Sequence, residues 1–414
     1  MRQKKKEGIY LSNPCIAVDI SMESSHMLGF YDSNKKVTAK PQVIPHTLSG
    51  FNVLLNLFNK IKKETNIEPI IVFEYTGVYH KTLQLFLDDN NIQYYMIHPT
   101  KSSKHRQNKD NPIKTDSLDC INLAEMYYEN NMGIFYKRSD LYQNLKELDV
   151  YYQSNKEMLQ ELEVTLCEKL AVIYPLYKTI CSDILSENSL KFLFKFPHPK
   201  YFTNYDKDHF IEWYMNNCHH SYNYSLNQYN KILDYTNSIY SGCKEHSIIV
   251  QSMMDTIFLI VNLLDIQQNV INKLIELASN DKNFEIICSI PNIGKLTAAR
   301  LIAEYGEISR FSTPEKMNKY AGINPCINQS GKFDGKHISI SKNGNSILRE
   351  ILFLAVRSMI KKDSKAFSIR DFYLKKKAQP RIHPKVALVA TMNKFNRTLY
   401  SLCKKGTLYD PSQL

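Results

Sequence analysis

Four acidic residues stand where they could hold metal ions. Asp19 and Glu74 each end a short apolar run that is typical of a buried strand. Asp116 and Asp119 are three residues apart at the predicted start of a helix, which places both carboxylates on one helical face. Residues at the carboxyl ends of strands line the crevice where α/β sheets bind ligands. Four oxygen ligands of this kind suit two Mg²⁺ ions, which activate a nucleophile and stabilise a leaving oxygen in phosphoryl transfer.

Ordinary structural roles remain open for part of this set. Acids in the first turn of a helix, such as Asp116 and Asp119, are favoured by the helix dipole and by capping. Asp19 and Glu74 each terminate a hydrophobic strand, which is unusual for a packing residue. The order of the four acids, with the basic Lys114 nearby, favours the metal site.

A serine in the C-terminal part of the chain is a candidate nucleophile. Ser330 lies in a polar stretch, is followed by Gly331 and is flanked by Lys332 and Lys336. A hydroxyl beside cations and an Mg²⁺ site could attack a phosphodiester and keep a covalent link to it. Most serines in loops only face solvent, and the residues alone leave that alternative open.

Several segments could contact phosphates. The stretch Ile290–Arg300 resembles one half of a helix-hairpin-helix, in which a tight turn presents backbone N–H groups to DNA. Asn292 takes the place of the usual first glycine and tolerates left-handed geometry. An ordinary helix start is the alternative. The candidate phosphate contacts here are Asn292, Gly294 and Lys295.

Two other basic segments are candidate phosphate contacts. Lys342, Asn343, Asn345 and Arg349 surround the start of a further helix, and a capped helix start is the alternative there. A polar basic stretch after Pro99 is expected to be a loop. It contributes the candidates Lys101, Lys104, Arg106 and Lys114.

An α/β unit at the start of the chain is expected to position the four acids. Within residues 1–135, the pattern predicts strands at 16–18, 26–31, 36–39, 69–73 and 93–97, and helices at 48–63, 79–89 and 115–128.

A long helical region should follow at residues 136–283. Apolar residues at steps of four and three run from Leu141 to Ile173, and a second seam runs from Met253 to Leu274, so the two are expected to form an antiparallel coiled coil. Residues 186–246 look like an insertion at its tip, with no role assigned. Cys218, His220, Cys243 and His246 could hold zinc there, although their spacing is irregular.

The remainder, residues 284–414, is predicted to be mainly helical and carries the excess charge. The chain has 53 Lys and Arg against 41 Asp and Glu, and the segment from Ser330 onward has 18 against 5. A concentrated basic field indicates a polyanionic partner such as nucleic acid. A surface that only aids solubility is the alternative.

Composition also indicates the redox state of the cysteines and the location of the protein. Nine scattered cysteines without a C-x-x-C pair indicate reduced thiols. No apolar run reaches the length of a membrane span, and no apolar core follows the basic N-terminus, so a cytoplasmic protein without a membrane partner is expected.

Together these motifs resemble the insertion-sequence "one-ten" transposases and the related Piv-type DNA invertases. Segments 17–21, 73–77 and 114–119 are similar to the motifs of that family's RuvC-like DEDD domain. Segments 290–300, 320–322, 330–331 and 340–349 are similar to those of its second, transposase domain. The similarity covers about 15–135 and 285–400 in the family's order. It implies a RuvC/RNase H-like α/β domain, a coiled coil and a mainly α domain.

The resemblance also implies a mechanism. A structured guide RNA, the bridge RNA, would pair with donor and target double-stranded DNA. Asp19, Glu74, Asp116 and Asp119 would bind Mg²⁺, and Ser330 would form a covalent 5′-phosphoserine in a composite site across protomers. A tetramer built from two dimers is implied, with the coiled coil as a dimerisation element.

Three other classes fit parts of the sequence. A RuvC-like, structure-specific endonuclease would use the same four acids with water as the nucleophile. Strands that end in Asp also open actin-like sugar kinases, but the second phosphate loop of those enzymes is not found here. A non-catalytic nucleic-acid binder would use the acids as helix caps.

Overall fold

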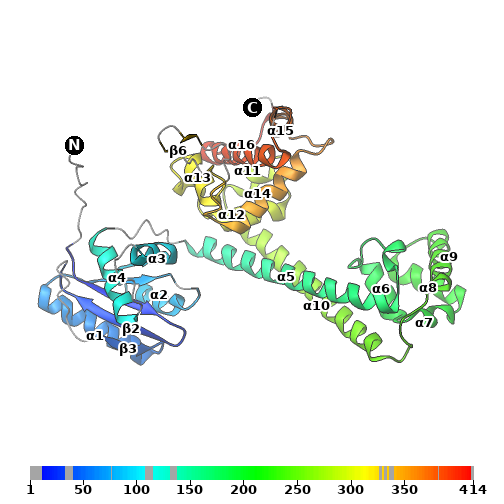
Figure 1. The fold of residues 1–414 in the computed structure, drawn as a ribbon, viewed down its shortest axis with the longest axis horizontal. Helices are drawn as coiled ribbons and strands as arrows, with labels where there is room; N and C mark the ends of the chain where they lie inside the picture. Colours follow the sequence, from blue (N-terminus) through cyan, green and yellow to red (C-terminus); the bar gives the residue numbers. More distant parts are fainter. Residues whose placement is uncertain are drawn as a thin grey trace. The chain divides into compact units, whose positions relative to one another are not determined.

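The computed structural model describes residues 12–32, 41–75, 77–107, 115–130, 138–325, 329–330, 333–334, 340–380 and 382–411. The chain divides into two compact units, residues 1–137 and 138–414, and each is described by itself (Figure 1). The three predicted domains, with boundaries near 135 and 283, remain a prediction.

The first unit is built on a mixed five-stranded sheet. Its strands are β1 (Cys15–Ile20), β2 (Ser24–Phe30), β3 (Gln42–Pro45), β4 (Ile70–Glu74) and β5 (Tyr94–Ile97), in the order β3-β2-β1-β4-β5. The first three strands form an antiparallel meander, and β4 and β5 run parallel to β1. This arrangement is consistent with the predicted RuvC-like α/β domain.

Helices cover both faces of this sheet. One face packs against α1 (Leu48–Thr65) and α2 (His80–Asp89), and the other packs against α4 (Asp116–Tyr128). Side chains alternate along each strand, so β1 and β4 serve both cores. Ile16, Val18, Ile71 and Phe73 face α1 and α2, whereas Cys15, Ala17, Ile70 and Val72 face α4.

The segment after Pro99 is a helix in the structure. The stretch after Pro99 was expected to be a loop, and this is wrong up to Gln107, because it forms α3 (Pro99–Gln107). Contacts with α4 hold this polar helix in place: Asn122 donates to Ser102 Oγ at 3.3 Å, and His105 Nδ1 lies 2.6 Å from Asn122 Oδ1. The predicted strand at 36–39 lies outside the described residues.

The second unit begins with a pair of long helices, α5 (Asp140–Ile173) and α10 (Ile248–Ala278). Tyr142 donates to Asp281 just beyond α10, Gln267 of α10 donates to the carbonyl of Tyr152, and Lys169 donates to Thr256. Because the partners descend in number along α10 as they rise along α5, the two helices run antiparallel. Supercoiling of this pair remains a prediction.

Helix α10 corrects the expectation that no segment could span a membrane. It has 31 residues, and an 18-residue window in it reaches a mean hydropathy of 1.6, which suffices by length and composition. The expectation was based on uninterrupted apolar runs, whereas the mean hydropathy of a window stays high when a few polar residues interrupt the run. A mostly buried core helix passes the same test. Helix α10 packs along α5 through Met253, Ile257 and Ile260, and 28% of the window is buried.

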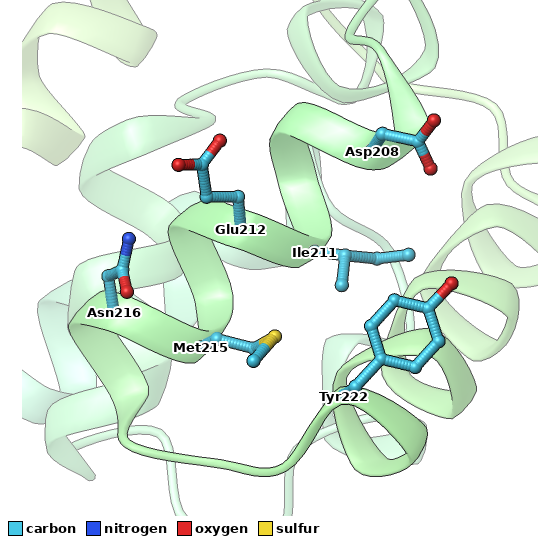
Figure 2. Close-up of a pocket in the computed structure, with 6 residues that line it drawn as sticks. All are labelled: Asp208, Ile211, Glu212, Met215, Asn216 and Tyr222. Carbon is cyan, nitrogen blue, oxygen red and sulfur yellow. The ribbon is translucent and has the colours of Figure 1, made fainter.

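The insertion between these helices folds into a small helical module. It contains α6 (Glu187–Lys195), α7 (Pro199–Thr203), α8 (Lys207–Cys218) and α9 (Tyr222–Ser238) around an aromatic core. Phe196, Phe202 and Phe210 are almost fully buried at its centre. A pocket of about 340 Å³ opens between α8 and the start of α9 (Figure 2). None of the predicted site residues lines it.

The remaining helices pack around the ends of α5 and α10 that carry Leu145 and Leu274. They are α11 (Phe284–Cys288), α12 (Lys295–Tyr305), α13 (Pro314–Ala321), α14 (Ser346–Met359), α15 (Phe367–Lys377) and α16 (Pro384–Lys405). Between α13 and α14 the chain forms two short strands, β6 (Gln329–Ser330) and β7 (Phe333–Asp334), which pair antiparallel. The C-terminal region is therefore mostly helical, as predicted.

Candidate active site

Two of the predicted metal ligands lie at neighbouring strand ends in the first unit. Val18 of β1 pairs with Phe73 of β4 in a parallel register, and Asp19 and Glu74 are the next residues of the two strands. Because Ala17 and Val72 face α4, the alternation of side chains places Asp19 and Glu74 on the α4 face as well. The two carboxylates therefore come from adjacent strands on the same face.

The other two acids begin the helix that covers this face. Thr115 caps α4 with an extended backbone, and its Oγ1 accepts from the backbone N–H of Leu118 at 3.3 Å. The cap fixes Asp116 and Asp119 in the first turn. Asp119 is buried, whereas the side chain of Asp116 is 59% exposed. The structure thus brings all four predicted acids to one region of the first unit.

The electrostatics of Asp19 show that these carboxylates affect one another. Burial and, after it, the charges of Asp119, Asp116 and Glu74 raise the pKa of Asp19 to about 6, and His26 opposes the shift. A carboxyl pKa rises in this way where negative charge is crowded and incompletely compensated. Such a site favours the binding of a divalent cation.

Two basic side chains contact the acids of α4. His26 Nε2 lies 3.3 Å from Asp116 Oδ2, and Arg106 Nε of α3 lies 3.3 Å from Asp119 Oδ1. His26 is not among the site residues predicted from the sequence. Its position could have been found from the β1–β2 hairpin, because His26 is the residue paired with Asp19.

The chemistry of the donor set fits Mg²⁺, although the present arrangement would have to adjust. Carboxylate oxygens are the ligands that Mg²⁺ prefers. In the part of the chain that the structure describes, no three His, Cys, Asp or Glu side chains are arranged to hold an ion. The contact between Arg106 and Asp119 would have to open for both carboxylates of α4 to bind metal.

Replacing Arg106 with glutamine is expected to strengthen divalent-metal binding. The ion would no longer have to displace a guanidinium from Asp119, and a partly exposed ion pair of this kind contributes about 1 kcal/mol or less, so Kd should fall by up to about fivefold. Calorimetric titration of the full chain with Mn²⁺ measures the change.

The matched control is Lys104→Gln, which removes the same charge from an exposed position of the same helix. Equal tightening in both variants would mean that net charge, and not the contact with Asp119, controls metal affinity. No tightening in Arg106→Gln would place the ion elsewhere.

The predicted nucleophile lies in the second unit. Ser330 is in β6, which pairs with β7 so that Ser330 stands opposite Phe333. Outside these two strands, Pro325 and Ile340 form an isolated antiparallel bridge. We call the described residues of this stretch, 323–325, 329–330, 333–334 and 340–341, the serine hairpin. Lys332 and Lys336, predicted beside Ser330, lie outside the described residues.

The predicted phosphate contacts that follow the serine hairpin make internal bonds. Asn345 caps α14 by accepting from the N–H of Leu348 at 3.0 Å, and it also donates to Glu304. Arg349 Nη1 donates to the carbonyl of Ala321 at 3.1 Å. Lys342 has a left-handed backbone, with φ of 52°, and both Lys342 and Asn343 are exposed. Their contact with nucleic acid remains a prediction.

The turn before α12 has the conformation expected of it. Asn292 adopts a left-handed φ of 67°, its side chain accepts from Ser364 Oγ, and Gly294 caps the helix. Asn292, Gly294 and Lys295 are exposed, so a ligand could reach the start of α12. The helix-hairpin-helix assignment itself remains a prediction.

The remaining predicted residues are the lysines near α3 and the cysteines and histidines of the insertion. Lys101 and Lys104 are exposed on α3, and Lys114 lies outside the described residues. In the small helical module of α6–α9, from here on the tip module, the ring of His220 stacks on Tyr224 with centroids 4.2 Å apart, and Cys218 is buried. Among the described residues no cluster of three potential ligands joins Cys218, His220, Cys243 and His246.

Comparison with known proteins matches both parts of the chain. Residues 16–175 match the model of the DEDD transposase domain of IS110 elements, and residues 284–373 match the model described as "Transposase IS116/IS110/IS902 family".

Individual relatives are similar over shorter stretches. An uncharacterised protein of insertion element IS110 from Streptomyces coelicolor is 26% identical over 30% of this chain and 30% of its own length. A transposase of insertion sequence IS1111A from Coxiella burnetii is 26% identical over 32% of this chain and 36% of its own length. A pilin gene-inverting protein from Moraxella bovis is 28% identical over 30% of this chain and 38% of its own length.

The matches to these curated relatives thus span about a third of their length. The two family models, by contrast, together cover both the sheet that carries the four acids and the helices on either side of Ser330. The chain therefore belongs to the IS110/IS116 family of insertion-sequence transposases and carries the DEDD domain of that family.

Proposed function

We propose that the chain is an Mg²⁺-dependent DNA recombinase that moves an insertion sequence under the guidance of a structured RNA. The observation that carries the proposal is the gathering of Asp19, Glu74, Asp116 and Asp119 on the α4 face of the sheet, where burial and the neighbouring negative charges raise the pKa of Asp19. The family match supports the transposase class. The guide RNA rests on the resemblance and on the basic C-terminal segment.

Within this proposal the four acids would hold two Mg²⁺ ions. When bound, these ions would supply positive charge to the phosphate and lower the pKa of the attacking hydroxyl. The carboxyl ends of the strands are where an α/β sheet of this kind binds its ligand.

Ser330 would supply the nucleophile. Its hydroxyl oxygen attacks the phosphorus, the bond from phosphorus to the 3′ oxygen breaks, and a 5′-phosphoserine forms. The serine proton ends on the departing 3′-hydroxyl group. A 3′-hydroxyl of the exchanged strand then attacks the phosphoserine, which restores the DNA phosphodiester and the free serine.

The partners follow from the same proposal. Donor and target DNA duplexes pair with the RNA, and the exposed Lys342, Asn343 and Lys295 contact phosphates. Dimers formed through α5 and α10 assemble into tetramers, so that the acids of one protomer and Ser330 of another act on one phosphodiester.

A recombination assay that removes the metal tests the proposal. The full chain is purified with its co-purifying RNA and incubated with DNA that carries element ends and a target. Strand-exchange products are expected with Mg²⁺, and none with EDTA or after RNase treatment.

Two outcomes would overturn this function. Strand cleavage without any exchange or adduct would identify a structure-specific endonuclease that uses water. DNA binding without strand breakage under any divalent metal would identify a non-catalytic binder.

A further inference from the structure

A buried charge cluster joins α5 to α12 in the second unit. Lys146 and Asp149 come from α5, and Arg300 and Glu304 come from α12. Lys146 Nζ lies 2.6 and 2.8 Å from the two carboxylate oxygens of Glu304, and Arg300 Nε donates to Asp149 Oδ1 at 2.6 Å. The side chains of Asp149 and Glu304 are fully buried. A charge that is buried without a partner pays a large desolvation penalty, so these ion pairs should stay formed in the folded chain.

The two buried carboxyl groups also affect each other's pKa. Burial and a hydrogen bond with Glu304 raise the pKa of Asp149 to about 7, against the opposing effect of Arg300. Within the described residues, Asp149 Oδ2 finds no donor. Burial would raise the pKa of Glu304, but the hydrogen bond with Asp149, the charge of Lys146 and the bonds from Lys146 and Asn345 together lower this pKa, which keeps Glu304 ionised for its other partners.

Glu304 reaches a third element, the segment that precedes α14. Asn345 Nδ2 donates to Glu304 Oε2, Asn345 Oδ1 accepts from Leu348, and the Asn345 backbone N–H donates to the carbonyl of Tyr320 at 2.9 Å. The Tyr320 hydroxyl in turn donates to the carbonyl of Glu304 at 3.2 Å. Three hydrogen bonds, to Glu304, from Leu348 and to the carbonyl of Tyr320, therefore fix the position of Asn345.

The residues beside Asn345 form the base of the serine hairpin. Ser341 N–H donates to the carbonyl of Asn324 at 2.9 Å, and Lys342 N–H donates to the carbonyl of Gly322 at 3.2 Å. A Cβ added to Gly344 would lie 2.5 Å from the Tyr320 carbonyl oxygen and 2.6 Å from Gly322 N. The two backbones touch here, so fixing Asn345 fixes both ends of the serine hairpin.

We propose that Glu304 is a positioning residue that anchors the base of the serine hairpin to α5 through Asn345 and Lys146. The placement of Ser330 then depends on the long helix that also leads to the tip module. The anchor itself needs only the contacts above, and its catalytic meaning rests on the proposed role of Ser330. Glu304 is fully buried, so bound DNA would not reach its side chain.

Hydrogen exchange of the full chain tests the anchor without DNA. In Glu304→Ala, the amides of Ser341, Lys342 and Asn345 should exchange about tenfold faster, while those within α16 keep their rates. Asn345→Ser should act alike at Ser341 and Lys342, because serine still caps α14 but is too short to reach Glu304.

The matched control is Lys156→Met. It removes another ion pair of α5 with the C-terminal helices, Lys156 Nζ to Glu350 Oε1 at 2.7 Å, but that pair does not touch the serine hairpin. The amides at the hairpin base should keep their rates in this variant. Unchanged exchange in Asn345→Ser, or a uniform increase across α11–α16 in Glu304→Ala and Glu304→Gln alike, would overturn the anchor.

A second readout separates the anchor from the function of Ser330. The rate of protein–DNA adduct formation should fall at least tenfold in Glu304→Ala at unchanged DNA affinity, and Glu304→Gln should recover part of it because its amide oxygen can still accept from Asn345. Faster exchange at the hairpin base with an unchanged adduct rate would refute the positioning role. Faster exchange in a chain that never forms an adduct would contradict the role of Ser330 and leave the anchor standing.

Discussion

Replacing Ser330 with alanine should abolish the covalent protein–DNA adduct. The substitution removes one oxygen atom, and the backbone pairing of β6 with β7 does not depend on it. RNA and DNA binding should therefore persist, while recombination falls by at least about a thousandfold, as is usual when a nucleophile is lost. A denaturing gel with end-labelled DNA, guide RNA and Mg²⁺ detects the adduct directly.

The matched control for this variant is Ser312→Ala, which changes an exposed serine of the same helical region. It should retain the adduct at the level of the unchanged chain. An adduct that survives Ser330→Ala would mean that another side chain attacks the phosphate. Cleavage without an adduct in the unchanged chain would favour water as the nucleophile.

The gathering of the four acids could be anticipated from local patterns alone. Apolar runs that end in Asp19 and Glu74 predict buried strands, and the i, i+3 spacing of Asp116 and Asp119 predicts a shared helical face. What the sequence does not contain is the strand order, which makes β1 and β4 neighbours. That adjacency arises from long-range pairing, and only the structure shows it.

The basic partners of these acids illustrate what local patterns miss. Arg106 was expected in a basic loop that faces nucleic acid, yet it lies on a helix and pairs with Asp119. The helix depends on contacts of Ser102 and His105 with Asn122, a residue of another element. Propensity alone could not reveal it, because the polar sequence of α3 has no apolar face.

Asn345 shows the same limit in the C-terminal region. Its type and its place before a helix predicted either a cap or a phosphate contact, and the cap is present. Its bond to Glu304, and the bond of Glu304 to Lys146, join residues that are 41 and 158 positions apart. Buried polar networks of this kind follow from tertiary packing and leave no periodic pattern in the sequence.

Replacing Asp19 with asparagine should abolish recombination and yet stabilise the metal-free fold. The raised pKa of Asp19, about 6, means that its charge is unfavourable in the folded state. For an acid shifted in this direction, the stability lost to ionisation grows as the pH rises from about 4 through the folded pKa and stays constant above it. With allowance for its partial exposure, neutralising Asp19 should add about 1 kcal/mol to the free energy of unfolding at pH 8.

Thermal unfolding of the full chain in EDTA measures this gain. The transition of the first unit should rise by about 2–4 °C at pH 8. The difference should shrink towards zero as the pH falls below 3.8, the ordinary pKa of an aspartate, because the carboxyl group of Asp19 is then protonated in the unfolded as well as in the folded state. Asp89→Asn, at an exposed acid of the same unit, should change little at either pH.

Adding Mg²⁺ should then reverse the order of the two proteins. The unchanged chain gains stability from the bound ion, whereas Asp19→Asn has lost a ligand and gains less. This reversal separates a metal ligand from an acid that only caps or packs, because a structural acid would lower stability when removed and would not respond to the ion. A variant that is less stable than the unchanged chain in EDTA at pH 8, or that gains as much from Mg²⁺, would contradict the metal-binding role of Asp19.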